Sequence, residues 1–254
     1  MKLLHMLRRA IGHVRRQQSW KHLCTLSGLN LNYNLNWDSI NVLKEIFYNR
    51  CYADYFPFYQ VANILDVGAH KGYFSLFAAM HTAPDSRIIA LEPYEVNYQA
   101  IVANLKANSI TTVTAVKAGL AAESGTAELF LSRSCNHSVL SQYPKIIGNN
   151  EKHQSVMINV YSLKSLLDRY RIDCIDFMKL DCEGGEYSIL FETDSETLSR
   201  IRTLSMEFHD TKDPRFTGLT MIEFLQAKGF SITHFCHSPT TRNINYGKII
   251  AIRH

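Results

Sequence analysis

From about residue 60 onward, short apolar runs alternate with longer stretches of helical character. Buried strands that alternate with helices predict a parallel sheet with helices on its faces, because parallel neighbours need a long crossover connection. The predicted strands cover residues 63–67, 87–91, 112–117, 126–131, 155–160, 177–180, 203–208, 231–235 and 248–252. The predicted helices cover residues 74–81, 96–108, 163–170 and 220–228, the last closed by Gly229. The sequence therefore predicts an α/β fold.

Two parts of the chain depart from this alternation. Strands 126–131 and 155–160 lie on either side of a polar segment with Asn136, Asn149 and Asn150, which predicts an inserted strand pair joined by a loop. The segment 1–58 leads into the aromatic-rich run FYNRCYADYFPFY at residues 47–59. This segment predicts a helical extension or lid in front of a main domain over 59–254, with a role in the acceptor pocket or in a homo-oligomer contact.

Composition gives expectations about nucleic-acid binding, membrane insertion and redox state, but the net charge does not choose the substrate. The chain has 27 Lys and Arg against 23 Asp and Glu, far from the cationic excess of a nucleic-acid-binding protein. No apolar run approaches the roughly 20 residues of a membrane-spanning helix. The six cysteines show no disulfide or metal-ligand spacing, so free thiols and a cytoplasmic location are expected.

The turn after the first predicted strand has the sequence DVGAHKG. Gly68 and Gly72 allow the backbone to turn sharply and a ligand to approach without meeting a Cβ. A dinucleotide site would have a glycine at position 70, where this chain has His70. The acidic-x-Gly-x-x-x-Gly pattern fits a turn that holds S-adenosylmethionine better than one that holds a diphosphate.

Glu92 ends the second predicted strand, where a carboxylate can accept hydrogen bonds from both ribose hydroxyls of an adenosine cofactor. Its alternative role is to begin the following helix as a capping acid. Asp66, at the end of the first strand, either contacts the ligand or orients the glycine turn. The residues assigned to the cofactor are Asp66, Gly68, Ala69, His70, Gly72, Tyr73, Glu92 and Pro93.

Over about residues 45–229 the sequence resembles the FkbM family of methyltransferases. The resemblance rests on ILDVGAHKGYFSL at 64–76, LEPYEVN at 91–97, NLKAN at 104–108, VYSLKSLL at 160–167, IDFMKLDCEGGEYSIL at 175–190 and MEFH at 206–209. The most specific part is the KLDCEGGE stretch, with four charged groups in eight residues. His70 departs from the asparagine that is more frequent in the family.

The resemblance implies the Rossmann-like fold of class I methyltransferases, with a mostly parallel seven-stranded sheet flanked by helices. It also implies a methyltransferase that uses S-adenosylmethionine and acts on a hydroxyl of a sugar, a glycan or a secondary metabolite. The acceptor cannot be carried over from the family.

Charged residues follow two predicted strands on the acceptor side. We assign Asp181 and His209 as the pair nearest the acceptor hydroxyl, one as base or orienting group, with neutral His209 suited to proton uptake. Lys179 either takes part in catalysis or neutralises neighbouring acids. Alternatively, Asp181 and Glu183 could hold Mg²⁺ and lower the pKa of the hydroxyl. Glu186 is expected to begin a helix.

Three other functions stay open from the sequence. A methyltransferase of RNA or protein is one, although KLDCEG stands where many enzymes that methylate nucleic-acid nitrogens have an Asn-Pro-Pro-aromatic motif. A second is a binding module that keeps the fold and the cofactor without turnover. The third is a nicotinamide dehydrogenase, which would bind NAD.

Overall fold

The computed structural model describes residues 28–31, 37–131, 154–210, 213–238 and 246–253. The first 27 residues of the predicted extension, and the loop expected to join the inserted strands, lie outside this part of the chain. Cys24 and Cys135 also lie outside it. Cys51, Cys174, Cys182 and Cys236 are free cysteines.

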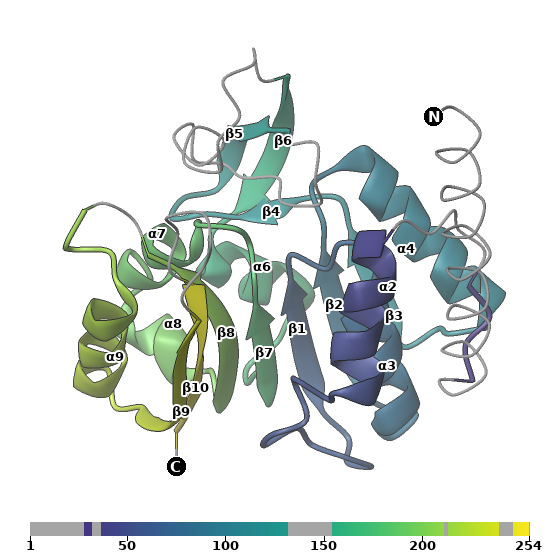
Figure 1. The fold of residues 1–254 in the computed structure, drawn as a ribbon, viewed down its shortest axis with the longest axis horizontal. Coiled ribbons are helices and arrows are strands. Elements are labelled where there is room, and N and C mark those ends of the chain that lie inside the picture. Colours follow the sequence, from purple (N-terminus) through teal and green to yellow (C-terminus); the bar gives the residue numbers. More distant parts are fainter. Residues whose placement is uncertain (1–27, 32–36, 132–153, 211–212, 239–245, 254) are drawn as a thin grey trace, which may run out of the picture.

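A seven-stranded sheet forms the centre of the molecule, in the order β3-β2-β1-β7-β8-β10-β9 (Figure 1). Its strands are β1 (Asn63–Val67), β2 (Arg87–Leu91), β3 (Val113–Val116), β7 (Phe177–Leu180), β8 (Thr203–His209), β9 (Ser231–Ser238) and β10 (Tyr246–Ile252). Only β10 runs antiparallel to its neighbours, β8 and β9. This confirms the predicted mostly parallel seven-stranded sheet.

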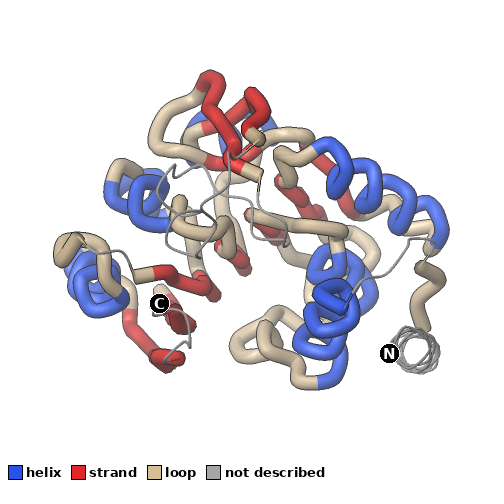
Figure 2. Tube along the Cα trace, turned by 45° about the horizontal axis from the view of Figure 1, so that its top comes forward, coloured by secondary structure: helices blue, strands red, loops and turns tan. Residues whose placement is uncertain are grey.

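Helices cover both faces of this sheet (Figure 2). One face carries α2 (Trp37–Leu43), η1 (Lys44–Tyr48), α3 (Tyr73–His81) and α4 (Glu95–Ala107), and the other α6 (Leu163–Tyr170), α7 (Glu186–Phe191), α8 (Ser195–Ser199) and α9 (Gly218–Ala227). Strand side chains alternate between the two faces. Ile64 therefore packs in the apolar cluster that contains Phe74 and Phe77 of α3. Leu65 and Val67 pack in the cluster on the other face, which contains Leu166 and Leu167 of α6.

A small three-stranded sheet stands beyond the carboxyl edge of the large one (Figure 1). It consists of β4 (Gly119–Leu120), β6 (Ser155–Tyr161) and β5 (Gly125–Phe130). The antiparallel pairing of β5 with β6 confirms the predicted strand pair. Strand β4 pairs in parallel with β6 and was not predicted, because two residues carry no periodicity.

The predicted boundaries agree with the observed ones to within a few residues. Strand β8 extends to His209, one residue beyond the predicted end at 208, so His209 lies within the strand together with Glu207. Helix α8 was not predicted, since five residues are too few for a helical pattern. None of the helices in the described ranges is long and apolar enough to cross a membrane.

The described part of the extension belongs to the main hydrophobic core. Leu43, Ile46 and Phe56 pack in the same buried cluster as Phe74 and Phe77 of α3. The Phe56 ring makes edge contacts with four other phenylalanine rings, at positions 58, 74, 77 and 177. A domain boundary at residue 58 stays a prediction.

Candidate active site

A cavity with an empty volume of about 1130 Å³ lies at the carboxyl ends of β1, β2 and β7. Three parts of the chain form its walls: the large sheet, the small sheet and the extension. Its lining includes Val42, Glu45, Ile46, Tyr52, Gly68, Ala69, His70, Tyr73, Phe74, Glu92, Pro93, Asn97, Gly119, Leu120, Leu129, Ile158, Lys179, Asp181, Glu183 and Glu207.

The glycine turn after β1 is packed tightly against the loop after β7. Gly68 has φ +74°, and a Cβ there would lie 1.8 Å from the carbonyl oxygen of Asp181. The amides of Gly68 and Ala69 donate to the Leu91 carbonyl oxygen at 3.2 and 2.9 Å. Only glycine fits position 68, and the turn is held against the ends of both neighbouring strands.

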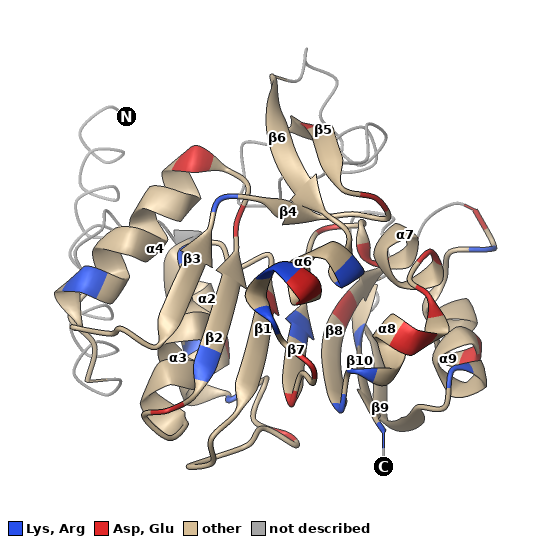
Figure 3. Ribbon diagram, turned by 180° about the vertical axis from the view of Figure 1, so that it is seen from behind, with Lys and Arg blue, Asp and Glu red and all other residues tan. Residues whose placement is uncertain are grey.

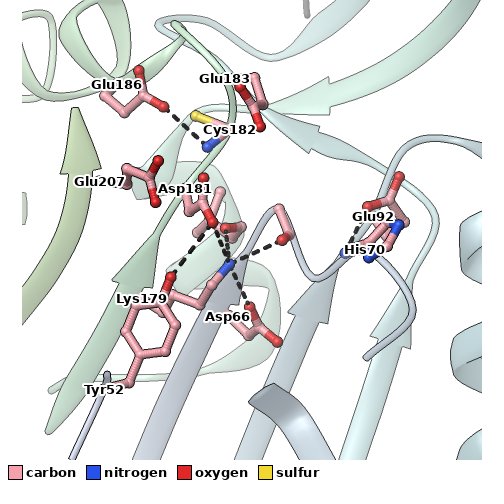
Figure 4. Close-up of polar contacts among 12 residues, drawn as sticks. Tyr52, Asp66, His70, Glu92, Lys179, Asp181, Cys182, Glu183, Glu186 and Glu207 are labelled. Atoms are coloured by element: carbon pink, nitrogen blue, oxygen red, sulfur yellow. Dashed lines mark hydrogen bonds and ion pairs between the residues drawn. The ribbon is translucent and has the colours of Figure 1, made fainter. Parts of the chain in front are cut away.

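Glu92 reaches the cavity from the end of β2. One carboxylate oxygen accepts a hydrogen bond from the backbone amide of His70 at 2.8 Å (Figure 4). The other accepts one from the backbone amide of Tyr94 at 2.9 Å. The side chain is only 6% exposed, and burial raises its pKa to about 7 although these hydrogen bonds oppose the rise. A carboxylate in this position can accept further hydrogen bonds from ligand hydroxyls.

Lys179 joins the ends of β1 and β7. It is the register partner of Asp66, and its Nζ lies 3.4 Å from Asp66 Oδ1, 3.6 Å from Asp181 Oδ2 and 2.9 Å from the Gly68 carbonyl oxygen (Figure 4). Burial lowers the pKa of Lys179, but Asp181 and Asp66 outweigh burial and raise it above its usual value. Lys179 therefore carries a positive charge and links the Gly68 turn to the Asp181 carboxylate.

Asp66 is fully buried and accepts a hydrogen bond from the Ser75 hydroxyl at 2.6 Å. It does not line the cavity, and neither does Gly72. Gly72 has a φ of +79° and is the N-cap of α3. Of the two roles left open for Asp66, these contacts favour orientation of the turn. The other six residues assigned to the cofactor line the cavity: Gly68, Ala69, His70, Tyr73, Glu92 and Pro93.

Asp181 faces the cavity from the loop after β7. The Tyr52 hydroxyl donates to its Oδ2 at 3.4 Å, and this same oxygen is the one near Lys179 (Figure 4). Burial and Asp181 raise the pKa of Tyr52 well above its usual value, so the hydroxyl keeps its proton. Sequence reasoning missed Tyr52, and its position in an aromatic-rich segment was the only signal.

His209 lies behind the cavity lining and is surrounded by acids. Its Nε2 is 3.3 Å from Glu183 Oε2 and 3.5 Å from Glu207 Oε1, and its Nδ1 is 3.4 Å from Glu186 Oε1. Burial lowers the pKa of His209, but Glu186 and Glu183 raise it well above its ordinary value. A positively charged imidazolium at neutral pH does not match the neutral base expected from the sequence.

Glu186 is the first residue of α7, as expected. Its carboxylate accepts hydrogen bonds from the amides of Cys182, at 3.0 Å, and Gly184, at 2.9 Å. Burial raises the pKa of Glu186, but His209 and the backbone amides of Glu186 and Gly184 outweigh burial and lower it. The carboxylate thus fixes the loop that carries Asp181 and Glu183, where Glu183 itself has the left-handed φ of +56°.

Three carboxylates from different elements face one end of the cavity. Glu45 comes from η1, Asp181 from the loop after β7, and Glu207 from β8. Burial raises the pKa of Glu45, and Glu207 and Asp181 raise it further. Burial and Asp181 likewise raise the pKa of Glu207. No sequence signal pointed to Glu45, whereas Glu207 stood beside the predicted strand end.

The described residues offer no metal site: among them, no three His, Cys, Asp or Glu side chains are grouped to hold a metal ion. Asp181 instead contacts Lys179 and Tyr52, and Glu183 contacts His209. The assignment of Mg²⁺ to Asp181 and Glu183 is therefore unsupported.

Comparison with known proteins finds similarity along most of the chain. A model of the methyltransferase FkbM domain matches residues 66–232. "Methyltransferase 1" of Beauveria bassiana is 28% identical over 204 residues, which cover 74% of this chain and 80% of that protein. "Methyltransferase sdnD" of Sordaria araneosa is 29% identical over 224 residues, covering 76% and 82%.

Solved structures share the fold at low sequence identity. The METTL16 MTase domain superposes with a TM-score of 0.53 at 12% identity, covering 94% of this chain and 80% of that one. The human methyltransferase 10 domain containing protein has a TM-score of 0.51 at 14% identity, covering 95% and 96%. Both likenesses concern the class I methyltransferase fold alone.

Proposed function

Because the chain belongs to the methyltransferase FkbM domain family, we propose that it binds S-adenosylmethionine in this cavity. In this proposal the protein transfers the methyl group to a hydroxyl oxygen of a sugar, a glycan or a secondary metabolite. The observation that carries the proposal is the juxtaposition of the Gly68 turn with the buried carboxylate of Glu92 in one cavity. The family implies S-adenosylmethionine as methyl donor.

The residues of the cavity fit such a donor. We assign the Glu92 carboxylate to the two ribose hydroxyls, since its oxygens face the cavity while backbone amides hold them in place. The neighbouring wall is apolar and is formed by Pro93, Leu120, Leu129 and Ile158. A flat, apolar adenine ring suits this wall because its burial there removes apolar surface from water.

Asp181 is the group that we assign to the acceptor. When bound, S-adenosylmethionine supplies an electrophilic methyl group. Tyr52 and Lys179 both contact Oδ2, so Oδ1 is the oxygen that we assign to the acceptor hydroxyl. In this role Asp181 would orient the hydroxyl and take up its proton.

His209 and Lys179 act as positioning residues in this proposal. The imidazolium of His209 holds Glu183 and Glu186, and Glu186 in turn holds the loop that carries Asp181. Lys179 pairs with Asp181 Oδ2 at 3.6 Å and so fixes the carboxylate at the cavity. Neither group needs to lose its proton during the reaction.

The test combines ligand binding with turnover. We expect S-adenosylhomocysteine to bind the purified protein in a calorimetric titration, and we expect Asp181→Asn to retain this binding. Sugar and metabolite hydroxyls would then be screened for methyl transfer, with the Asp181→Asn variant losing at least about a hundredfold in turnover.

Other outcomes point to the other candidates. Failure of the folded protein to bind S-adenosylhomocysteine would overturn the proposal. Equal loss of binding and turnover in Asp181→Asn would move Asp181 into the cofactor site. Transfer to RNA or to a protein, with no transfer to hydroxyl metabolites, would replace the acceptor class proposed above.

A further inference from the structure

The cavity continues past Asp181, on the side away from Glu92. There β8 contributes Glu207 (Figure 4), and the extension contributes Glu45, which lies near Glu207 and Asp181. With the donor assigned to the Gly68 turn and Glu92, this end of the cavity is where the acceptor would enter. Its polar groups are the carboxylates of Glu45, Asp181 and Glu207, with the Tyr52 hydroxyl and Lys179 beside Asp181.

Carboxylates outnumber cationic groups around this end, among the residues that the structure describes. Lys179 lies between Asp66 and Asp181, and its charge is shared by both. The imidazolium of His209 is shared by Glu183, Glu186 and Glu207.

A third cationic group, Lys248, lies on β10 opposite Glu207 in the sheet register. Its Nζ is 4.9 Å from the centroid of the Tyr52 ring. Lys248 is not part of the cavity lining, and burial lowers its pKa. The acceptor end is thus negative, and acidic positions on β8 and the nearby loops stand out in red in Figure 3.

We propose that the acceptor carries a protonated amine close to the hydroxyl that is methylated, and that Glu45 and Glu207 recognise this amine. This inference rests on the proposed function of the cavity. Glu207 is partly buried, so less water screens its charge than that of an exposed carboxylate, and Glu45 adds a second negative charge at an exposed position of the same lining. The same charges repel a carboxylate or phosphate on the acceptor and favour amino sugars and hydroxylated amine metabolites.

The position of Glu45 would make the preference for an amine-bearing acceptor a property of this chain. Glu45 lies outside the span 66–232 that matches the family model, whereas Asp181 and Glu207 lie within it. The extension therefore adds a carboxylate to a cavity whose donor side belongs to the family domain.

The test uses ligands that do not depend on knowing the acceptor. In three analogues of S-adenosylhomocysteine, nitrogen replaces sulfur and carries a propyl arm that ends in an ammonium, a hydroxyl or a carboxylate group. The arm extends from the position of the transferred methyl group into the acceptor end. We expect calorimetry to show the ammonium arm binding about tenfold more tightly than the hydroxyl arm and the carboxylate arm binding most weakly.

The variants Glu45→Gln and Glu207→Gln should each reduce the ammonium preference to about threefold or less. Their affinity for S-adenosylhomocysteine, which has no arm, should stay unchanged. Glu223→Gln, at an exposed position of α9, is the matched control and should keep the full preference.

Equal affinity for the three arms, preference for the carboxylate arm, or rejection of every arm by protein that binds S-adenosylhomocysteine would each overturn this inference alone. The comparison of arms on the unmodified protein holds even if a variant fails to fold. Absence of S-adenosylhomocysteine binding would instead overturn the proposed function.

Discussion

At the scale of single residues, Glu92 illustrates how burial prepares a side chain for a ligand. Two backbone amides hold the carboxylate, yet burial still raises its pKa to about 7. In the absence of ligand the group therefore titrates near neutral pH. The ionised form is the better acceptor for two ribose hydroxyls, so proton binding and cofactor binding compete.

We predict that the affinity for S-adenosylhomocysteine rises about tenfold between pH 6 and pH 8, because the ionised fraction of a group with a pKa near 7 rises by about this factor. The measurement is calorimetric titration at several pH values. Glu92→Gln cannot ionise, and it should bind more weakly with little dependence on pH. If Glu92→Gln bound with the same pH dependence as the unmodified protein, the group that titrates would be a residue other than Glu92.

At the scale of secondary-structure elements, the parallel pairing of β1 with β7 brings together charges that are distant in sequence. Asp66 and Lys179 are register partners on the same face of the sheet, and both are buried. A buried charge that loses its partner is strongly destabilising, whereas removal of both partners costs less.

We predict that Lys179→Met lowers the free energy of unfolding by about 3–5 kcal/mol, since it leaves the Asp66 charge buried without a cation. Asp66→Asn in the same chain should recover part of this loss, as measured by urea unfolding in a double-mutant cycle. Lys164→Met is the exposed control and should cost at most about 1 kcal/mol. Strictly additive losses for Lys179 and Asp66 would argue against the coupling.

The extension is a second element whose contribution can be measured. Phe56→Ala should lower the free energy of unfolding by about 3–5 kcal/mol, because the side chain is buried among four phenylalanine rings. Val61→Ala, at a position that is 64% exposed, should change it by about 0.5 kcal/mol or less. A small effect of Phe56→Ala would mean that the extension is only loosely attached to α3.

At the scale of the whole molecule, ligand binding should stabilise the fold, because three separate parts of the chain form the cavity. S-adenosylhomocysteine at a hundred times its Kd should raise Tm by about 5–10 °C in a thermal unfolding experiment. NAD at the same concentration should leave Tm unchanged. Stabilisation by NAD alone would favour the dehydrogenase that the sequence left open.

Much of the fold could be predicted because its signals are local. The strands Asn63–Val67 and Arg87–Leu91 have their predicted bounds, since each is an apolar run that ends at a glycine turn or an acid. Short elements such as β4 and α8 were missed, because two and five residues are too few to show a repeated pattern. Their positions depend on pairing and packing with distant segments.

What the sequence by itself determined was the order of the elements, the glycine turn, the carboxylate of Glu92 and the resemblance to the family, all of which lie in contiguous runs. Only the tertiary structure decided that Tyr52 and Glu45 stand beside Asp181 and that His209 is surrounded by acids. The physical reason is that charge and hydrogen bonding depend on neighbours in space. The extension brings Tyr52 and Glu45 to Asp181, whereas the pairing of β7 with β8 brings Glu183 and Glu186 to His209.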